Sequence, residues 1–387
     1  KLRFPSFDEP YKQCRIGDIY AERSQRGASD MELLSVMMND GVMPRSEIEG
    51  KDNSSEDKSN YKVVLTGDMV YNSMRMWQGA NGISPCDGIV SPAYTVLMPK
   101  IPISNGYFAA FFKSPNLINE FRKNSQGMTS DTWNLKYPQI ETIKVCIPAL
   151  SEQNRVADML RTLERRIAKQ AQLVDNLKKY KRGVVRTLLS PDSCCIEETT
   201  WTTAKIGDLG SFTKGAPLSK ADITPDGTPF ILYGELYTTY HEVINSVIRR
   251  TKAQPEKQYY SHVGDVIIPT SGETPEEIST AACVMLPDII LAGDLNIFRS
   301  SKIDGRIMSY ILNHIVNGQI ARIAQGKSVV HIQASEISKI EISYPDYNTQ
   351  CKMISVFETV GARIKSAENE LTYLRTMQKA LLQQLFI

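Results

Sequence analysis

The chain has 387 residues, which is enough for two domains of ordinary size, each burying its own core. Hydrophobic residues make up 42% and charged residues 23%, as in globular proteins, and no apolar run approaches the ~20 residues of a membrane span. The net charge is only +2, and the seven cysteines are scattered without a CxxC pair. These features argue against a disulfide framework or a zinc site and favour a reduced, cytoplasmic protein.

Residues 1–150 have the pattern of a mixed α and β domain. Short apolar runs bounded by Gly, Pro, Asn and Asp predict strands at 61–65, 69–71 and 94–98. An amphipathic pattern predicts one helix over residues 106–123, and the polar run 49–59 predicts an exposed loop. We therefore expect an α+β domain in which loops connect the strands.

Residues 151–190 predict one long helix. The stretch contains no Pro, and its apolar residues follow the alternating three- and four-residue spacing of a coiled-coil seam. At 1.5 Å per residue the helix would be ~55 Å long. Its Lys and Arg residues outnumber its Asp and Glu residues by six. The seam positions that we assign here are Val156, Leu160, Leu163, Ile167, Val174 and Leu177.

Residues 191–347 form a linker and a second domain of the same kind, with a strand predicted at 263–268 and one helix at 305–325. Residues 348–387 then repeat the long helix without a gap, 197 residues further along the chain. Gln153, Arg166 and Ile167 recur as identical residues in the second copy. Its seam positions are Phe357, Val360, Ile364, Leu371 and Leu374.

The chain is therefore ordered as domain, helix, domain, helix. Two such helices can pack antiparallel through matching seams, which predicts a pseudo-twofold internal repeat with one domain at each end of a rod. The half-sites of a DNA duplex have the same twofold relation, at multiples of ~34 Å. This geometry fits a protein that reads a split DNA site.

Several short motifs mark equivalent places in the two halves. The first half has Ile16-Gly17-Asp18, Gly67-Asp68, and Pro148-Ala149-Leu150-Ser151-Glu152-Gln153 at the start of its long helix. The second half has Ile206-Gly207-Asp208 and Gly264-Asp265, but its long helix opens differently, with Asp346-Tyr347-Asn348-Thr349-Gln350. The first domain also contains Arg75-Met76-Trp77-Gln78-Gly79-Ala80 and Ser91-Pro92-Ala93-Tyr94.

With these motifs and its tandem arrangement, the chain resembles the specificity (S) subunits of Type I restriction–modification systems over essentially its whole length. The resemblance implies a non-catalytic subunit with no cofactor of its own. It also implies target recognition domains at 1–150 and, after a linker, within 191–347, separated by spacer helices at 151–190 and 348–387. Each domain would read one half of a bipartite sequence in double-stranded DNA. The helices would bind two methyltransferase (M) subunits, which hold S-adenosylmethionine, and motor-nuclease (R) subunits would complete the restricting complex.

In the first domain, two segments carry side chains that can read base edges. Arg can contact guanine, and Asn and Gln can contact adenine, through paired hydrogen bonds. The other interpretation is a strand edge with the Trp in the core, followed by a loop that only caps a helix. The candidate DNA-binding residues here are Asn72, Ser73, Arg75, Trp77 and Gln78 after a predicted strand, and Gln126, Thr129, Ser130 and Asn134 in a Gln-Gly loop.

The second domain has polar residues at the equivalent places. Hydroxyl groups there can contact phosphates or bases, and a carboxylate can accept from cytosine. A plain polar turn is the alternative interpretation. The candidates are Thr270, Ser271 and Glu273 in the first segment, and Lys327, Ser328 and His331 in the second Gln-Gly loop.

Other polar motifs have simpler interpretations. The Gly-Asp pairs are typical of turns in which Asp bonds nearby backbone, and the four isolated histidines do not predict a metal site. The basic run 178–182 could contact DNA phosphate, contact a partner subunit, or remain a solvated helix face.

Two other classes of protein are weaker alternatives. A stand-alone DNA methyltransferase or nuclease lacks support, because the sequence has no FxGxG cofactor loop, no NPPY- or DPPY-like motif and no convincing nuclease carboxylate cluster. A coiled-coil assembly scaffold without DNA specificity predicts that the chain together with an M subunit ignores duplex sequence, which a competition assay at fixed salt can decide.

Overall fold

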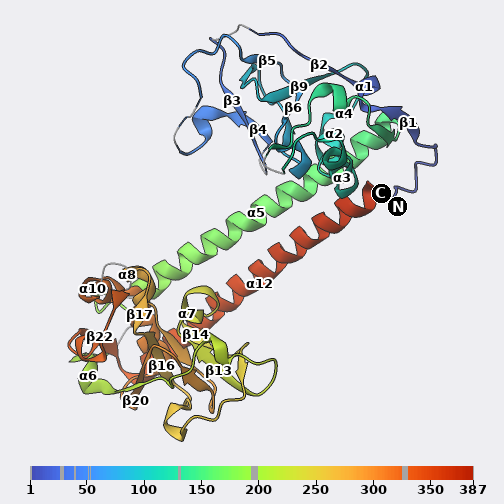
Figure 1. Ribbon diagram of the computed structural model, residues 1–387. Coiled ribbons are helices and arrows are strands. Elements are labelled where there is room, and N and C mark those ends of the chain that lie inside the picture. The colour runs from blue at the N-terminus through green and yellow to red at the C-terminus, as the bar shows by residue number, and fades with distance from the viewer. Residues whose placement is uncertain are drawn as a thin grey trace. The chain divides into compact units, whose positions relative to one another are not determined.

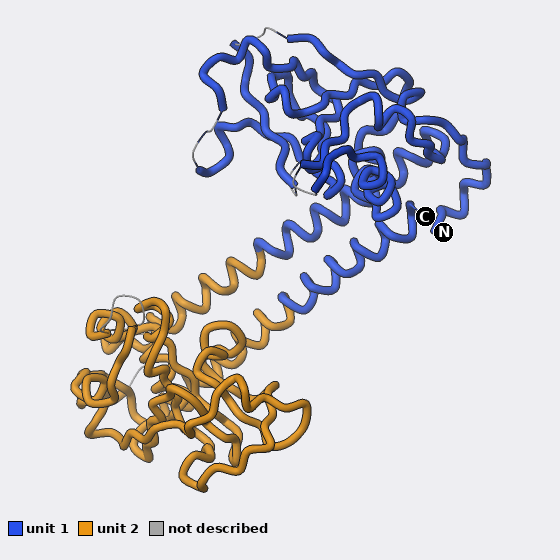
Figure 2. The backbone as a smooth tube through the Cα atoms, in the orientation of Figure 1, with its two compact units in different colours: residues 1–172, 368–387 blue, residues 173–367 orange. Residues whose placement is uncertain are grey.

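The computed structural model describes residues 2–26, 30–38, 41–50, 52, 54–129, 132–192, 199–324 and 330–386. The chain divides into two compact units, one of residues 1–172 with 368–387 and the other of residues 173–367 (Figure 2). Each unit contains one β-rich domain and parts of both long helices (Figure 1). The fold is α+β with a tandem repeat, as the sequence predicts. Within the described residues no helix has both the length and the apolar character needed to cross a membrane.

The first unit is built around a four-stranded sheet of order β2-β9-β6-β7, whose neighbouring strands are all antiparallel. Two further antiparallel pairs are β3 with β4 and β5 with β8, and β1 pairs with β10 near the start of the long helix. The strands are β1 Lys12–Arg15, β2 Tyr20–Glu22, β3 Leu34–Met37, β4 Gly41–Pro44, β5 Lys62–Val64, β6 Met69–Asn72, β7 Asn81–Ile83, β8 Gly88–Val90, β9 Tyr94–Pro99 and β10 Lys144–Ile147. The helices of this domain are α1 Ile16–Ile19, η1 Arg45–Glu47, η2 Met76–Gln78, α2 Asn105–Phe111, α3 Pro115–Asn124 and α4 Tyr137–Ile140.

The second unit has a five-stranded sheet of order β12-β20-β16-β18-β14, in which β14 joins β18 in parallel. Its first three strands repeat the order β2-β9-β6 of the first unit, and β11 pairs with β22 as β1 pairs with β10. The strands are β11 Trp201–Lys205, β12 Gly210–Lys214, β13 Thr228–Leu232, β14 Val243–Ile244, β15 Arg250–Thr251, β16 Asp265–Pro269, β17 Ser271–Gly272, β18 Ala282–Val284, β19 Ile290–Ala292, β20 Leu295–Ser300, β21 Val330–His331 and β22 Glu341–Pro345. The helices are α6 Ile206–Leu209, η4 Lys220–Asp222, α7 Glu235–Thr238, η5 Lys257–Tyr259, α8 Pro275–Ile278, α9 Gly305–His314, α10 Asn317–Ile323 and α11 Ala334–Ile337.

The two long helices are α5 Leu150–Leu188 and α12 Tyr347–Leu385, each of 39 residues. In each unit a part of α5 lies beside a part of α12 running in the opposite direction (Figure 2). In the first unit Arg166 on α5 pairs with Glu370 on α12 at 2.9 Å. All eleven seam positions assigned from the sequence are buried or half-buried, whereas the charged residues between them are mostly exposed.

Each β-rich domain packs its helices and the long helices into one apolar core. In the first unit, Val156 and Leu160 of α5 join Leu385 and Phe386 in a cluster with the aromatic face of α2. In the second unit, Val185 and Leu189 join Phe357 in a cluster with α9. Burying this apolar surface is the main force that attaches each domain to its helices.

The single helix predicted in each domain is wrong, because each is two helices. In the first domain α2 ends at Phe111 and α3 begins at Pro115. Ser114 accepts a hydrogen bond from Leu117 N, and Pro115 at the first helical position has no N–H to continue the preceding helix. In the second domain α9 ends at His314 and α10 begins at Asn317.

Two of the four Gly-Asp pairs form turns at the starts of β6 and β16, as the sequence predicts, whereas Gly17-Asp18 and Gly207-Asp208 lie in the short helices α1 and α6. Gly67 and Gly264 have φ angles of 91° and 94°, a region that favours glycine. Asp68 and Asp265 are buried, and each accepts a hydrogen bond from the backbone N–H three residues earlier, at 2.9 and 2.8 Å. The two carboxylates therefore have a structural role.

Both buried carboxylates also pair with an arginine. Arg23 Nε lies 2.6 Å from Asp68 Oδ2, and Arg299 Nη2 lies 2.6 Å from Asp265 Oδ2. Arg23 follows β2, whereas Arg299 is on β20, so the same charge is neutralised from different strands in the two domains. The repeat therefore preserves the position of the carboxylate and not the origin of its partner.

Candidate nucleic-acid interface

The turn after β6 holds the first group of candidates. Asn72 Oδ1 accepts from Met74 N at 3.0 Å and Asn72 O accepts from Arg75 N at 3.0 Å, which folds the chain back into η2. Gly79, with a φ of 89°, ends this short helix. The side chains of Arg75 and Gln78 are exposed, and Arg75 Nη1 donates to Gln78 Oε1 at 3.4 Å. Two long polar side chains therefore lie next to each other on the surface.

Trp77 and Ser73 have different surroundings. Trp77 is half-buried, donates from Nε1 to Met74 O at 3.1 Å, and packs edge-on against Trp133 with ring centroids 5.2 Å apart. The guanidinium of Arg122 lies 5.6 Å from the Trp77 ring centroid. Ser73 is buried, and its hydroxyl is 2.8 Å from Thr95 Oγ1 inside the domain.

The Gln-Gly loop of the first domain contacts this turn. Reciprocal backbone hydrogen bonds between Gln126 and Asn134, at 3.0 and 2.8 Å, close the loop. Leu135 N donates to Ser73 O at 2.8 Å, which joins the loop to the turn after β6. Gln126 and Thr129 are exposed, and Asn134 Oδ1 is buried with no partner among the described residues. Ser130 lies outside the described residues.

The second domain joins the equivalent two segments. Ile332 N donates to Thr270 O at 3.0 Å, and β17 pairs with β21 so that Ser271 faces His331. Ser271 is buried and donates from Oγ to Asp294 Oδ2 at 2.8 Å. His331 is exposed. Lys327 and Ser328 lie outside the described residues.

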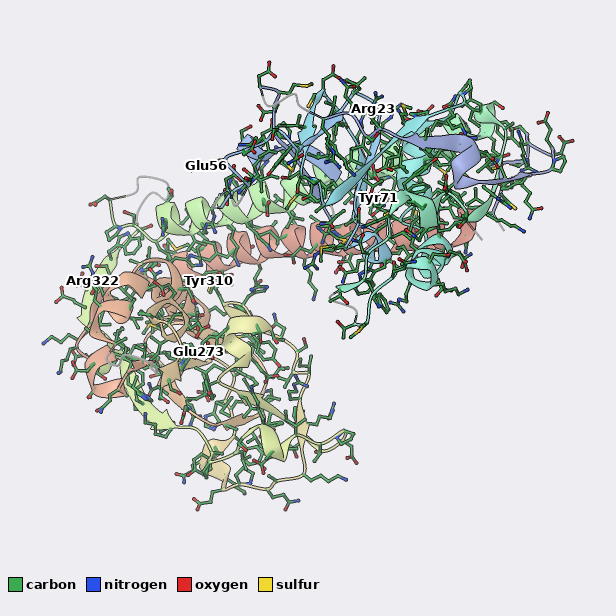
Figure 3. All side chains as sticks on the ribbon, turned by 45° about the horizontal axis from the view of Figure 1, so that its top comes forward. Arg23, Glu56, Tyr71, Glu273, Tyr310 and Arg322 are labelled. Carbon is green, nitrogen blue, oxygen red and sulfur yellow. The ribbon has the colours of Figure 1, made fainter. Side chains whose placement is uncertain are left out.

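Glu273 begins the exposed part of this surface and is labelled in Figure 3. Its backbone N–H donates to Glu277 Oε2 at 2.9 Å, and the next residue, Thr274, caps α8 by accepting from Glu277 N at 3.2 Å. Glu273 directly precedes the N-cap residue of this short helix, and its side chain is exposed.

A hollow of about 420 Å³ adjoins Thr270 and includes two residues that the sequence pattern did not single out. Lys214, at the end of β12, donates from Nζ to Oδ1 of the fully buried Asn296 at 2.8 Å, and burial lowers the Lys214 pKa. Asp294 lines the same hollow. Arg122 and Trp133 were missed in the first domain for the same reason, since no regular spacing connects these positions to the candidate turns.

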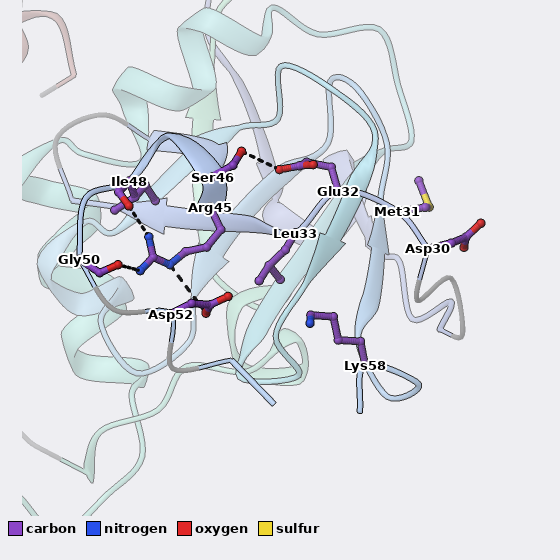
Figure 4. A pocket seen from close by; sticks show the side chains of 10 residues that line it. All are labelled: Asp30, Met31, Glu32, Leu33, Arg45, Ser46, Ile48, Gly50, Asp52 and Lys58. Carbon is purple, nitrogen blue, oxygen red and sulfur yellow. Dashed lines mark hydrogen bonds and ion pairs between the residues drawn. The ribbon is translucent and has the colours of Figure 1, made fainter. Parts of the chain in front are cut away.

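A second hollow, of about 540 Å³, lies in the first unit and contains none of the candidates (Figure 4). Arg45 on its wall donates to Ile48 O at 2.6 Å and to Gly50 O at 2.9 Å, and lies 3.8 Å from Asp52. The arginine is thus occupied by its own loop. Among the residues that the structure places, no group of three or more His, Cys, Asp and Glu side chains could hold a metal ion.

Comparison with known proteins defines the class of the second half of the chain. Residues 198–375 match the family model described as "Type I restriction modification DNA specificity domain". They contain the β-rich domain of the second unit with its polar turn and loop. This half of the chain is therefore similar to the DNA specificity domains of Type I restriction–modification systems.

Solved structures are similar to the chain over its whole length. One, described as "Structural basis underlying complex assembly andconformational transition of the type I R-M system", has a TM-score of 0.63 at 13% identity and covers 100% of this chain and 99% of its own. The HsdS subunit from Thermoanaerobacter tengcongensis has a TM-score of 0.53 at 13% identity, covering 99% and 98%. The Type I restriction–modification S subunit from M. genitalium has a TM-score of 0.59 at 13% identity, covering 99% and 98%. At this identity the matches establish the fold.

The first half of the chain repeats structural features of the matched second half. Its central strands, Gly-Asp turn and loop attachment have the same arrangement as in residues 198–375. Residues 198–375 match the specificity-domain family model, and the whole chain has the fold of solved Type I restriction–modification S subunits.

Proposed function

We propose that the chain reads a bipartite DNA sequence with its two domains and positions partner adenine methyltransferase subunits on it. One observation carries the proposal. In both domains the turn after the central strand is bonded to the Gln-Gly loop at the same place, by Leu135 N to Ser73 O at 2.8 Å and by Ile332 N to Thr270 O at 3.0 Å. These pairs are separated by the same 197 residues as the helix repeat. Each domain therefore presents one composite polar surface.

The exposed members of the two surfaces differ in chemistry, which supports recognition of two different half-sites. The first surface carries Arg75 and Gln78, which suit guanine and adenine edges in the major groove. The second carries Glu273 and His331, and a carboxylate suits cytosine N4. The buried hydroxyls of Ser73 and Ser271 hold these surfaces in place.

The remaining candidates extend the same two surfaces. Gln126, Thr129, Ser130 and Asn134 would complete the first surface, and Thr270, Lys327 and Ser328 the second. Trp77 would act mainly by fixing the turn, because it is packed between Trp133 and Arg122. Side chains that contact phosphates would set the register of each domain on the duplex.

The partners follow from the family. Two methyltransferase subunits, which carry S-adenosylmethionine, would bind the helical part of the chain, and motor-nuclease subunits would join them in the restricting complex. The protein would then bind cytoplasmic double-stranded DNA. Its recognition domains would lie at 1–150 and within 191–347, and its spacer helices at 151–190 and 348–387. A structure similar to this chain is described by its complex assembly, which supports a multisubunit setting.

The test is to express the chain with its cognate methyltransferase subunit in a host that lacks both, and to map methylated adenines over the host genome. We expect one split motif, with two specific halves and a gap of fixed length. A continuous motif would contradict the proposal that two separate domains each recognise one half-site. Methylation without sequence preference would indicate a scaffold, and methylation by the chain without its partner would indicate an enzyme.

A further inference from the structure

Lys181 occupies a charged position in the otherwise largely apolar seam of α5, inside the second unit. Its Nζ lies 2.7 Å from Oε2 of Glu242, and both side chains are mostly buried, with 16% and 13% exposed. The other carboxylate oxygen, Oε1, lies 2.8 Å from Nε2 of His314 at the end of α9. Because an ionised carboxylate only accepts, this Nε2 carries a proton. Lys181 is therefore neither a solvated cation nor a phosphate contact.

Aromatic rings enclose this three-residue contact. Tyr310 of α9, labelled in Figure 3, has its ring centroid 5.4 Å from Lys181 Nζ and stacks on His314 at 6.1 Å. Its other neighbour is Phe357 of α12, at 4.5 Å. Contacts from both long helices thus meet at one side of α9.

Glu242 is held firmly in the domain. Its backbone oxygen accepts from Ser309 Oγ at 2.7 Å, while it also accepts from Cys283 N at 2.8 Å. Burial alone would raise the pKa of the carboxyl, but the hydrogen bonds from His314 and Lys181 and the charge of Lys181 lower the pKa to about 2. The carboxylate therefore stays ionised and bonded to the helix at neutral pH.

The first unit attaches its domain at the equivalent places with different chemistry. The counterpart of Lys181 is Gln378, which is uncharged. At the end of α12, Phe386 packs against Tyr107 and Phe111 of α2, with centroids 5.3 and 5.4 Å apart. The counterpart of Phe386 in the second unit is the smaller Leu189.

These two kinds of contact constrain a domain differently, although the first unit also has a charged contact to the other end of α5, between Arg3 and Glu152 at 2.7 Å. Apolar contacts depend on buried area and are not directional, so they tolerate small rotations. Hydrogen bonds between charged groups are short and directional, and they lose strength when their geometry changes. In the second unit, α12 is tied to the domain by Arg306 and Glu358 at 3.0 Å, and Lys181 ties α5.

We propose that the Lys181–Glu242–His314 contact is a positioning lock that fixes the orientation of the second recognition domain on α5 and so sets the gap length that the protein accepts. The inference rests on the proposed two-domain reading. Adding one base pair to the gap moves a half-site by about 3.4 Å along the duplex and rotates it, so a loosened domain would accept neighbouring gaps. The three side chains are mostly buried and bonded to one another, so neither half-site sequence should change.

The test uses the complex with the methyltransferase subunits and duplexes that carry both half-sites at the native gap or one base pair longer or shorter. Lys181→Met keeps an apolar seam but removes the charge, and Lys181→Met with Glu242→Gln also removes the unpaired buried anion. Lys181→Arg restores a cation, and Lys179→Met removes an exposed charge two residues away. Thermal unfolding of each variant is measured alongside.

We expect the methylation rate at neighbouring gaps, relative to the native gap, to rise about tenfold in the single and double Met variants, as directional bonds are lost. Lys181→Arg and Lys179→Met should remain close to the wild type. If Lys181→Met does not fold, the double variant decides. The proposal would be contradicted if the folded double variant kept the wild-type gap preference, or if its methylation rate fell equally at every gap. Absence of a split motif in the wild type would instead refute the two-domain reading itself.

Discussion

Gln153 and Gln350 make the same two hydrogen bonds in the two halves of the chain. Each side-chain Nε2 donates to the backbone oxygen of a proline that precedes the long helix. The partners are Pro148 O at 2.9 Å and Pro345 O at 2.8 Å. Each Oε1 accepts from a backbone N–H just before a helix of its domain, α2 in the first and α9 in the second, at 3.1 Å from Ser104 and 2.9 Å from Asp304. One buried amide thus joins a long helix to its domain, although the sequences opening the two helices differ.

Replacing either glutamine by Ala should destabilise its own unit. Gln153 and Gln350 are almost fully buried, so Ala leaves a backbone N–H and a carbonyl without partners. We expect a loss of about 2–3 kcal/mol in the free energy of unfolding for each variant. Denaturant titration of the purified chain measures this loss, with the exposed Gln172→Ala on α5 as the control. A change below about 0.5 kcal/mol, the range of surface substitutions, would contradict the role of the amide.

The repeat and the helix seam could be predicted because they depend on regular spacing along the sequence. Gln153 and Gln350 were visible as identical residues 197 positions apart, although their hydrogen bonds were not. The lock at Glu242 could not be predicted, because Lys181 and His314 are 61 and 72 residues from it and no period relates them. The same holds for the contact between Trp77 and Trp133.

Each of the two predicted helices is divided in two, which shows where the periodicity of apolar residues gives a wrong prediction. The apolar period runs on through Ser114 and Pro115, so periodicity alone favours one helix. The local chemistry of a capping Ser followed by Pro outweighs the period and starts a new helix. In the second domain no proline marks the break, and only the structure reveals the end of α9 at His314.

The stability of the second unit should contain an acid-sensitive part from Glu242. Its pKa falls from an ordinary 4.5 to about 2 in the folded state, so the stabilisation is complete above pH 4.5 and is lost as the pH falls toward 2. Relative to Glu242→Gln, the free energy of unfolding should fall by roughly 1.5 kcal/mol between pH 4.5 and 3. Denaturant titrations of both proteins at these pH values give the difference. A difference that does not change with pH would show that the carboxylate gains nothing from its partners.

The rate of cysteine alkylation should distinguish the buried Cys283 of the second unit from the exposed cysteines of the chain. Cys283 is fully buried, and burial raises its pKa to about 12, so at pH 8 only about one thiol in ten thousand is a thiolate. Cys146 and Cys351 are exposed. Alkylation followed by peptide mass spectrometry should modify these two within minutes and leave Cys283 unmodified until denaturant is added. Equal rates for Cys283 and Cys351 in the native protein would contradict the packing of β18 beneath α9.

Substitutions on the two polar surfaces should affect the two half-sites separately. Arg75→Ala and Gln78→Ala remove exposed groups that can each form paired hydrogen bonds with one base, which is worth about 1–3 kcal/mol of discrimination. We expect roughly tenfold to hundredfold relaxation at one or two positions of one half-site in the methylation map, with the other half and the gap unchanged. His331→Ala should relax only the opposite half-site, and the exposed Lys144→Ala should change neither. A uniform loss of methylation at all sites would indicate that these side chains contact only phosphates, because such contacts carry affinity without sequence information. If a single substitution relaxed the specificity for both half-sites, the proposal that each domain has its own DNA-binding surface would be excluded.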